Sequence, residues 1–277
     1  MAEILLNTPK MDTLGFESMS VAEIKPRVSI ASRAREKEGK SYWSFTAPGP
    51  LGVISLDTGT EDVLQTFVNG KGKKASLKKL KSAKDMLIDK DSKDAYVKEW
   101  QRAKDCIAAI IDNRKISTLV IDTATELWEL CRLSYHGKLA QVMPHQYAEP
   151  NDAFRSLLKS AYEDRKDLNA VWIHKMKKEY RTSAATGKDA WNGKYEFAGM
   201  SDVPFLVGTN IRNYRTQATD GEGNTVTGVS FGIEIIDSRQ SPELVTGLHL
   251  TGKDCSFDQL AMFLWPDADP DIWMDRK

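Results

Sequence analysis

The residue pattern with the clearest chemical meaning occupies positions 34–41, which read AREKEGKS. It matches the phosphate-binding loop G-x-x-x-x-G-K-[ST], except that Ala34 stands at the first glycine position. In such loops backbone N–H groups surround the phosphates, the lysine pairs with phosphate oxygens, and the hydroxyl binds Mg²⁺. The pattern therefore predicts that Gly39, Lys40 and Ser41, with the adjacent Tyr42, bind a nucleotide, and that Ser41 is a metal ligand.

A carboxylate that could share the metal ends the apolar run 118–121, where Asp122 follows the letters TLVI. An acid at the end of a buried strand opposite a phosphate-binding loop can order Mg²⁺ and its waters. The alternative is that Asp122 caps a helix expected over 125–135. The two roles can coexist, and we predict that Asp122 is a metal ligand.

Two acids follow another strand-like run. Asp57 ends the segment 51–56, and Glu61 lies four residues beyond it. A carboxylate at this place could orient the attacking water as a general base. The alternative is a polar turn built around Gly59. We predict that Asp57 and Glu61 are catalytic.

A histidine, His174, follows the apolar run 170–173, and lysines follow the histidine. His174 could sense a γ-phosphate by hydrogen bonding, although a single histidine is more often a structural residue. Lys175 and Lys177 follow it, and either could reach the γ-phosphate of a neighbouring subunit as a basic finger. We predict catalytic participation for His174 and this role in trans for the two lysines.

Short apolar runs alternating with helical patterns must position these residues. Nearly continuous apolar runs suit strands that are buried on both faces, as in a parallel sheet. We expect strands over 27–32, 51–56, 118–121 and 170–173, and helices over 92–112 and 151–165, the second capped by Asn151 or Asp152. This alternation predicts an α/β fold whose ligands gather at the carboxyl ends of the strands.

The last third of the chain changes character. The segments 206–215 and 229–236 alternate like strands on either side of DGEGN at 220–224, which predicts a hairpin. A further strand is expected over 248–250 and a final helix over 256–264. The parallel core should therefore carry an antiparallel C-terminal extension.

Composition excludes several classes of protein. The 277 residues include 39 Lys+Arg and 39 Asp+Glu, and 41% are hydrophobic, which is typical of a globular chain. No apolar run is long enough to span a membrane, and the N-terminus lacks a secretory signal. Three widely separated cysteines and four histidines predict neither a disulfide framework nor structural zinc, and favour a reducing, cytoplasmic location.

Taken in order, the segments resemble those of a known family. They are GKS at 39–41, TAPGPL at 46–51, LVIDT at 119–123, WIHK at 172–175, GKYEFAG at 193–199 and VPFLV at 203–207. This order resembles the RecA-like nucleotide-binding proteins of tailed bacteriophages, a group that includes single-strand annealing ATPases. The resemblance spans about residues 27–250.

The resemblance implies a RecA-like P-loop NTPase core with a mainly parallel central sheet and, as cofactors, ATP and Mg²⁺. It also implies a homo-oligomer, as a ring or a filament, in the host bacterial cytoplasm. Its partners would be single-stranded DNA and a single-strand-binding protein, and its task annealing, recombination or replication. The expected organisation is an N-terminal segment 1–26, an ATPase domain 27–250 with a lysine-rich insertion 70–92, and an acidic segment 251–277.

Two regions are candidates for DNA contact. The segment 71–84 carries seven lysines and no acid, and the segment 180–199 mixes bases with aromatic residues, as the DNA-binding loops of RecA-like proteins do. The alternatives are a solvated charged insertion and an ordinary surface loop. We predict DNA contacts from Lys73, Lys74, Lys78, Arg181, Lys188, Trp191, Lys194 and Tyr195. The stretch 264–273, which mixes aspartates with aromatic residues, could compete with DNA for basic patches or bind a partner, but a loosely ordered tail is expected.

Two other functions compete with an ATPase. The first is a non-hydrolysing DNA-binding or assembly scaffold, favoured by Ala34 at the first loop position and by Glu36 and Glu38 within the loop. The second is a small-molecule kinase, which the lack of an arginine-rich lid segment disfavours. Loss of DNA function on Lys40→Ala would separate the ATPase from the scaffold.

Overall fold

The protein is described here by a computed structural model. It describes residues 24–57, 62–63, 81–83, 92–138, 143–182, 189–219, 225–240 and 242–274. Glu61, Lys73, Lys74, Lys78 and Lys188 lie outside these ranges, as does the expected turn at 220–224.

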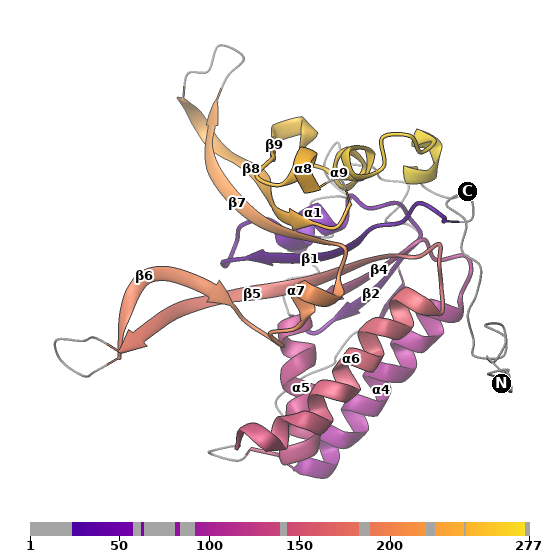
Figure 1. The fold of residues 1–277 in the computed structure, drawn as a ribbon, viewed down its shortest axis with the longest axis vertical. Coiled ribbons are helices and arrows are strands. Elements are labelled where there is room, and N and C mark those ends of the chain that lie inside the picture. Colours follow the sequence, from indigo (N-terminus) through magenta and orange to yellow (C-terminus); the bar gives the residue numbers. More distant parts are fainter. Residues whose placement is uncertain are drawn as a thin grey trace, which may run out of the picture.

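A nine-stranded sheet forms the centre of the fold, in the order β3-β2-β4-β5-β1-β7-β8-β9 with β6 paired to β5 (Figure 1). In this order the neighbouring strands β3, β2, β4, β5, β1 and β7 run parallel to one another. β8 pairs antiparallel with β7, β9 with β8, and β6 with β5. The strands are β1 (Ser29–Ala34), β2 (Leu51–Ser55), β3 (Lys81–Ala83), β4 (Thr118–Asp122), β5 (Asn169–Thr182), β6 (Asp189–Phe197), β7 (Thr209–Thr219), β8 (Thr225–Ser238) and β9 (His249–Thr251). The predicted mainly parallel sheet with an antiparallel extension is confirmed.

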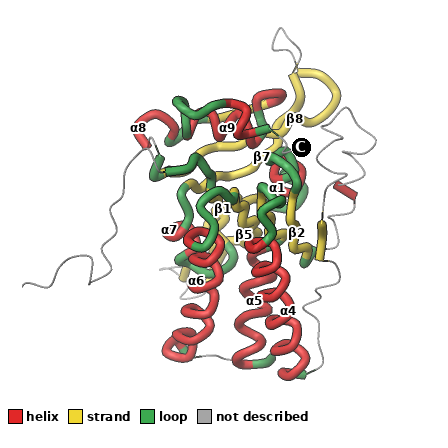
Figure 2. Tube along the Cα trace, turned by 90° about the vertical axis from the view of Figure 1, so that its right-hand side faces the viewer, coloured by secondary structure: helices red, strands yellow, loops and turns green. Residues whose placement is uncertain are grey.

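Helices cover both faces of this sheet, because its strands carry apolar residues on both sides. One face packs against α4 (Lys93–Asp112), α5 (Ala124–His136) and α6 (Ala148–Glu163). The other packs against α1 (Lys40–Ser44), α8 (Pro242–Val245) and α9 (Phe257–Leu264). Figure 2 shows the resulting three layers edge-on. Short helical turns complete the fold: α7 (Val203–Leu206), η3 (Pro144–Tyr147), η4 (Gly252–Asp254) and η5 (Pro270–Trp273).

Several predicted boundaries differ from the observed ones, and two of the differences lie beside a proline. The helix expected from 151 begins at Ala148, with Pro150 in its first turn, so neither Asn151 nor Asp152 caps it. The strand expected from 206 begins at Thr209, because the residues just before it form the short helix α7, with Pro204 in its first turn.

The segment expected to be a DNA-binding loop is instead part of a β-hairpin. β5 continues past the parallel sheet to Thr182 and pairs antiparallel with β6, from Met176 opposite Phe197 to Thr182 opposite Asp189. This β5–β6 hairpin projects from the body of the protein (Figure 1). Backbone pairing therefore orders residues that the sequence alone placed in a mobile segment.

The acidic C-terminal segment is also ordered where it is described. The helix expected over 256–264 is confirmed as α9, whose Phe257, Leu260 and Leu264 are buried against the sheet, and beyond it Trp273 is 2% exposed. The Trp265 indole N–H also donates a hydrogen bond to the carbonyl of Arg27, at 3.0 Å. The expectation of a loosely ordered tail is wrong, because its aromatic residues complete one side of the core.

Candidate functional site

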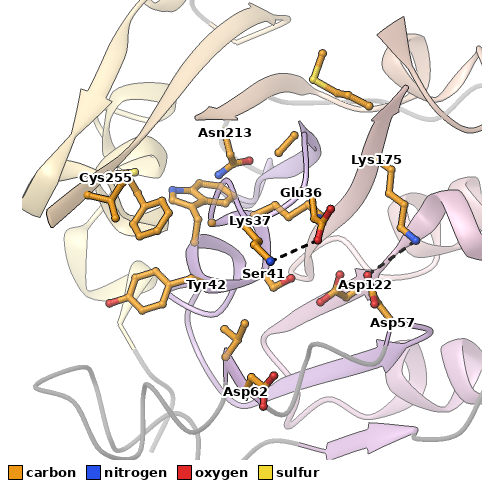
Figure 3. Close-up of a pocket in the computed structure, with 18 of the residues that line it drawn as sticks. Glu36, Lys37, Ser41, Tyr42, Asp57, Asp62, Asp122, Lys175, Asn213 and Cys255 are labelled. Carbon is orange, nitrogen blue, oxygen red and sulfur yellow. Dashed lines mark ion pairs between the residues drawn. The ribbon is translucent and has the colours of Figure 1, made fainter. Parts of the chain in front are cut away.

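A cavity of about 1100 Å³ lies at the carboxyl ends of β1, β2 and β4, beside the middle of β5 where its parallel pairing ends. Parallel strands of an α/β sheet place the ends of several elements at this edge, which is where ligands bind in such folds. Lys40, Ser41, Asp57 and Asp122 all line the cavity, as does Tyr42. Figure 3 shows Ser41 and Asp122 directed toward the same space. The fold thus brings together residues from three separate sequence motifs.

The loop at 34–41 connects β1 directly to α1 and has the local geometry that its glycine requires. Gly39 has φ 81°, in the left-handed region, and a Cβ placed there would lie 2.6 Å from Cδ1 of Phe231. Both conditions favour glycine. Ala34, by contrast, is the last residue of β1 and pairs with Lys175. Among the described non-glycine residues only Lys37, at φ 60°, has positive φ, so alanine fits at position 34.

The two glutamates of the loop point in different directions. Glu38 is buried and does not line the cavity, because its carboxylate is bound by the backbone N–H and the guanidinium of Arg35. Glu36 lines the cavity and is 87% exposed, with Lys37 Nζ 3.8 Å from its Oε1. Only one of the two negative charges therefore faces the space expected to hold phosphates.

The strand register helps explain why Asp57, Asp122 and Lys175 converge. Asp122 is aligned with Ser55 of β2 and with Ile173 of β5. Side chains alternate along a strand, so Lys175, two residues beyond Ile173, lies on the same face as Asp122. Asp57, two residues after the end of β2, lines the same cavity. Lys175 Nζ lies 4.0 Å from Asp57 Oδ2 and also pairs with Glu126 of α5.

Asp122 is not the cap of the following helix. The N-cap of α5 is Thr123, whose hydroxyl accepts a hydrogen bond from the N–H of Glu126 at 3.3 Å. Asp122 is 1% exposed and lines the cavity. The capping alternative is wrong, and its place at the cavity suits the metal-ligand role.

The two lysines predicted to act in trans make contacts within this chain. Lys175 lines the chain's own cavity and forms the two ion pairs described above. Lys177 Nζ lies 3.2 Å from Glu196 Oε1 across the β5–β6 hairpin. Reaching a neighbouring subunit would require both lysines to leave these carboxylates.

His174 lies on the opposite face of β5 from Lys175 and does not line the cavity. Its Nδ1 lies 3.3 Å from the carbonyl oxygen of Ala198, and its ring centroid is 4.2 Å from that of Phe197. A Cβ on Gly199 would approach Nδ1 to 2.9 Å. His174 thus packs at the base of the β5–β6 hairpin, away from the predicted phosphate site.

Because His174 is buried, its ionisation makes the stability of the folded protein depend on pH. Desolvation lowers the pKa of His174 to about 3 from 6.5, only partly offset by its hydrogen bond to Ala198. Below pH 6.5 the unfolded chain binds a proton that the folded chain does not, so stability falls as pH falls toward 3. Between pH 7 and pH 5 we expect the wild-type protein to lose about 2 kcal/mol in unfolding free energy through this histidine. His174→Gln should not show this loss, and urea denaturation at the two pH values would measure it. Equal pH dependence of both proteins would contradict the assignment.

An aromatic wall of the cavity was missed by sequence reasoning. The ring of Phe231, on β8, is stacked with that of Tyr42 at a centroid distance of 6.4 Å and an interplanar angle of 23°. Val229 of β8 and Cys255, just after η4, line the same cavity. No local pattern connects these residues with the loop at 34–41, since they approach it only through the pairing of β7 with β8.

The described residues proposed for DNA contact share the β5–β6 hairpin. Arg181 lies on β5, and Trp191, Lys194 and Tyr195 lie on β6. Trp191 is 47% exposed, and Lys178 Nζ lies 5.1 Å from its ring centroid. An exposed aromatic ring among basic side chains has the composition of a stacking platform for nucleic acid.

Residues 27–203, more than half of the chain, match the sequence model of a protein family described as AAA domain. The chain belongs to the AAA domain family. Its P-loop and Asp122 lie within the matched segment, whereas Phe231 and Cys255 follow it. The protein thus has a P-loop NTPase fold with a mainly parallel sheet, and the extension beyond the AAA domain supplies a wall of its cavity.

Solved structures that are similar to this one include the following two. One is a KaiC-like protein of the hyperthermophilic archaeon Pyrococcus horikoshii OT3, with 11% identity, a TM-score of 0.45, and coverage of 81% of this chain and 84% of that one. The other is an ATPase of the type III secretion system of pathogenic bacteria, with 11% identity, a TM-score of 0.43, and coverage of 70% and 52%. No curated protein matches this protein in sequence. None of its described helices is long and apolar enough to cross a membrane.

Proposed function

We propose that this AAA domain protein is a Mg²⁺-dependent ATPase that binds ATP in the cavity and acts on single-stranded DNA. The observation that carries the proposal is that Lys40, Ser41, Asp57 and Asp122 line one cavity with the Tyr42–Phe231 pair. The charged and hydroxyl groups of Lys40, Ser41, Asp57 and Asp122 would surround the phosphates and the metal. The rings of Tyr42 and Phe231 would contact the base. A volume of about 1100 Å³ leaves room for a nucleotide.

The donor set fits a metal that is held partly by the nucleotide. In the described part of the chain no three His, Cys, Asp or Glu side chains form a metal-binding group. Ser41 and Asp122 would supply two protein ligands, and Mg²⁺ commonly takes one or two protein groups together with phosphate oxygens and waters. When bound, Mg²⁺ would neutralise charge on the phosphates.

The remaining cavity residues suggest how the chain would prepare hydrolysis. Lys40 would pair with phosphate oxygens, and Asp57, 4.0 Å from Lys175 Nζ, would accept a hydrogen bond from the attacking water and orient it. Glu61, four residues after Asp57, remains a second candidate for this role. We further propose that the protein works as a homo-oligomer, which light scattering with and without nucleotide would test.

We place single-stranded DNA on the β5–β6 hairpin. Its exposed Trp191, the neighbouring Lys178 and the adjacent Lys194 offer a ring for base stacking and cations for phosphates. The hairpin projects from the body of the protein, where a strand could reach it (Figure 1). Annealing or recombination would then follow from holding single strands in an accessible form.

Replacing Trp191 with alanine should weaken oligonucleotide binding. Stacking on one aromatic ring contributes about 1–3 kcal/mol, which corresponds to about 5- to 150-fold in affinity. Fluorescence anisotropy with a labelled poly-dT oligonucleotide would measure it. Phe205→Ala is the matched control, because Phe205 is 74% exposed but lies on α7, outside the hairpin. Equal affinities of both variants and the wild type would contradict the placement.

The proposal as a whole is tested by titrating a fluorescent ATP analogue into the wild-type protein with Mg²⁺ and with EDTA. Micromolar affinity that depends on Mg²⁺, together with phosphate release stimulated by single-stranded DNA, is the expected result. Salt-sensitive DNA binding without nucleotide binding would instead support the non-hydrolysing scaffold. Phosphoryl transfer to a nucleoside monophosphate would support a kinase.

A further inference from the structure

The P-loop contains an arginine, Arg35, that does not line the cavity. Its Nε donates a hydrogen bond to Glu38 Oε1 at 2.7 Å, and Nη2 lies 2.5 Å from the same oxygen. Its backbone N–H donates to Glu38 Oε2 at 2.8 Å. Glu38 is only 2% exposed whereas the Arg35 side chain is 47% exposed, so water reaches the contact from the guanidinium side and screens it in part. The Arg35–Glu38 contact therefore ties the beginning of the loop to the residue that precedes Gly39.

The same guanidinium contacts the β5–β6 hairpin. Arg35 Cζ lies 5.3 Å from the ring centroid of Tyr195. The hydrogen bond and charge of Glu38 raise the pKa of Arg35, and Tyr195 raises it further. Tyr195 also packs edge-on against Trp191, at a centroid distance of 6.0 Å and an angle of 72°. A continuous series of contacts thus joins the hairpin aromatics to the P-loop backbone.

The base of the hairpin is held firmly enough for this contact to be specific. The Thr125 hydroxyl, near the start of α5, donates to the carbonyl of Ala198 at 2.6 Å and accepts from the N–H of Lys175 at 2.9 Å. The Ala198 N–H also donates to the Lys175 carbonyl at 2.9 Å. Both strands of the hairpin are therefore fixed to the core beside the cavity, which places Tyr195 at a defined position over Arg35.

We propose that Arg35 is a positioning residue through which the β5–β6 hairpin sets the conformation of the P-loop. Tyr195 holds the guanidinium, the guanidinium holds Glu38, and Glu38 holds the loop backbone that precedes Gly39 and Lys40. The inference rests on the proposed nucleotide site. It makes nucleotide affinity depend on Tyr195, a hairpin residue that lies outside the cavity. A ligand that binds at Tyr195 and changes nucleotide affinity would have its own affinity changed by the nucleotide by the same factor.

A double-mutant cycle with the fluorescent ATP analogue and Mg²⁺ tests the coupling. Arg35→Ala and Tyr195→Ala should each weaken nucleotide binding about 3- to 10-fold. Because both residues act through one contact, the double variant should lose no more affinity than the single variant with the larger loss. Tyr195→Phe keeps the ring and should restore most of the affinity. Tyr180→Ala, at a 59% exposed position of the same hairpin, is the control and should bind like the wild type. Wild-type affinity of Tyr195→Ala, or multiplicative effects in the double variant, would overturn the proposal.

A second measurement needs no nucleotide and separates this proposal from the proposed function. The Arg35 amide, bonded to Glu38, should be protected from hydrogen exchange in the wild-type protein, and NMR should find its exchange about 3- to 10-fold faster in Tyr195→Ala. Unchanged thermal unfolding would show that the fold is intact. Unchanged exchange at Arg35 would refute the coupling even if ATP binds, whereas faster exchange in a protein that binds no ATP would refute only the proposed function.

Discussion

Lys40→Ala is expected to weaken ATP binding by about 100-fold. Lys40 lines the cavity next to Ser41 and carries the ammonium group that a P-loop directs at phosphate oxygens. Two charge-assisted hydrogen bonds of about 1.5 kcal/mol each give about 3 kcal/mol, or two decades of affinity. Titration of a fluorescent ATP analogue with Mg²⁺ would measure the loss.

Lys37→Gln is the matched control for this variant. Lys37 belongs to the same loop and lines the same cavity, but its side chain is 78% exposed and faces Glu36. Exposed ion pairs contribute about 1 kcal/mol or less, so we expect less than a fivefold change in affinity. If Lys37→Gln and Lys40→Ala reduced binding equally, the loss would reflect general electrostatics rather than a phosphate-binding loop.

Asp122→Asn is expected to reduce the rate of ATP hydrolysis at least 100-fold while leaving binding of the nucleotide in EDTA unchanged. Asparagine has the size of aspartate but lacks the charge that holds Mg²⁺, and metal stabilisation of the transition state contributes several kcal/mol. The measurement is phosphate release over a range of Mg²⁺ concentrations, with nucleotide binding in EDTA measured in parallel.

The comparison variant is Asp112→Asn, at the exposed end of α4 and away from the cavity. Its hydrolysis should match that of the wild type. Because Asp122 is buried, thermal unfolding of Asp122→Asn must first show that the variant is folded. A folded variant that hydrolyses ATP at the wild-type rate would remove Asp122 from the proposed mechanism.

The residues proposed to bind phosphate and metal could be selected from the sequence because the chemistry proposed for them is local. A loop that surrounds phosphates needs Gly39, Lys40 and Ser41 side by side, so the motif is readable without the fold. Asp122 was predictable as well, because a single acid after three buried apolar residues marks the end of a strand. Once the sheet is parallel, such strand ends meet at one edge.

The choice between His174 and Lys175 could not be made from sequence. Adjacent residues of a strand point to opposite faces, so His174 and Lys175 lie on opposite sides of the sheet. Which one faces the cavity depends on the pairing of Asp122 with Ile173, and that register is a property of the assembled sheet. The sequence favoured the histidine for its chemistry, whereas the register directs Lys175 to the cavity.

By itself, the sequence determined the α/β class, the P-loop, the carboxylate Asp122 and the antiparallel extension, because each depends on residue types close together in the chain. Only the tertiary structure decided that Phe231 and Cys255 close the cavity, that Glu38 turns away from it, and that Tyr195 rests on Arg35. These contacts join segments far apart in the sequence. They arise from strand pairing and core packing, which no local pattern of residues encodes.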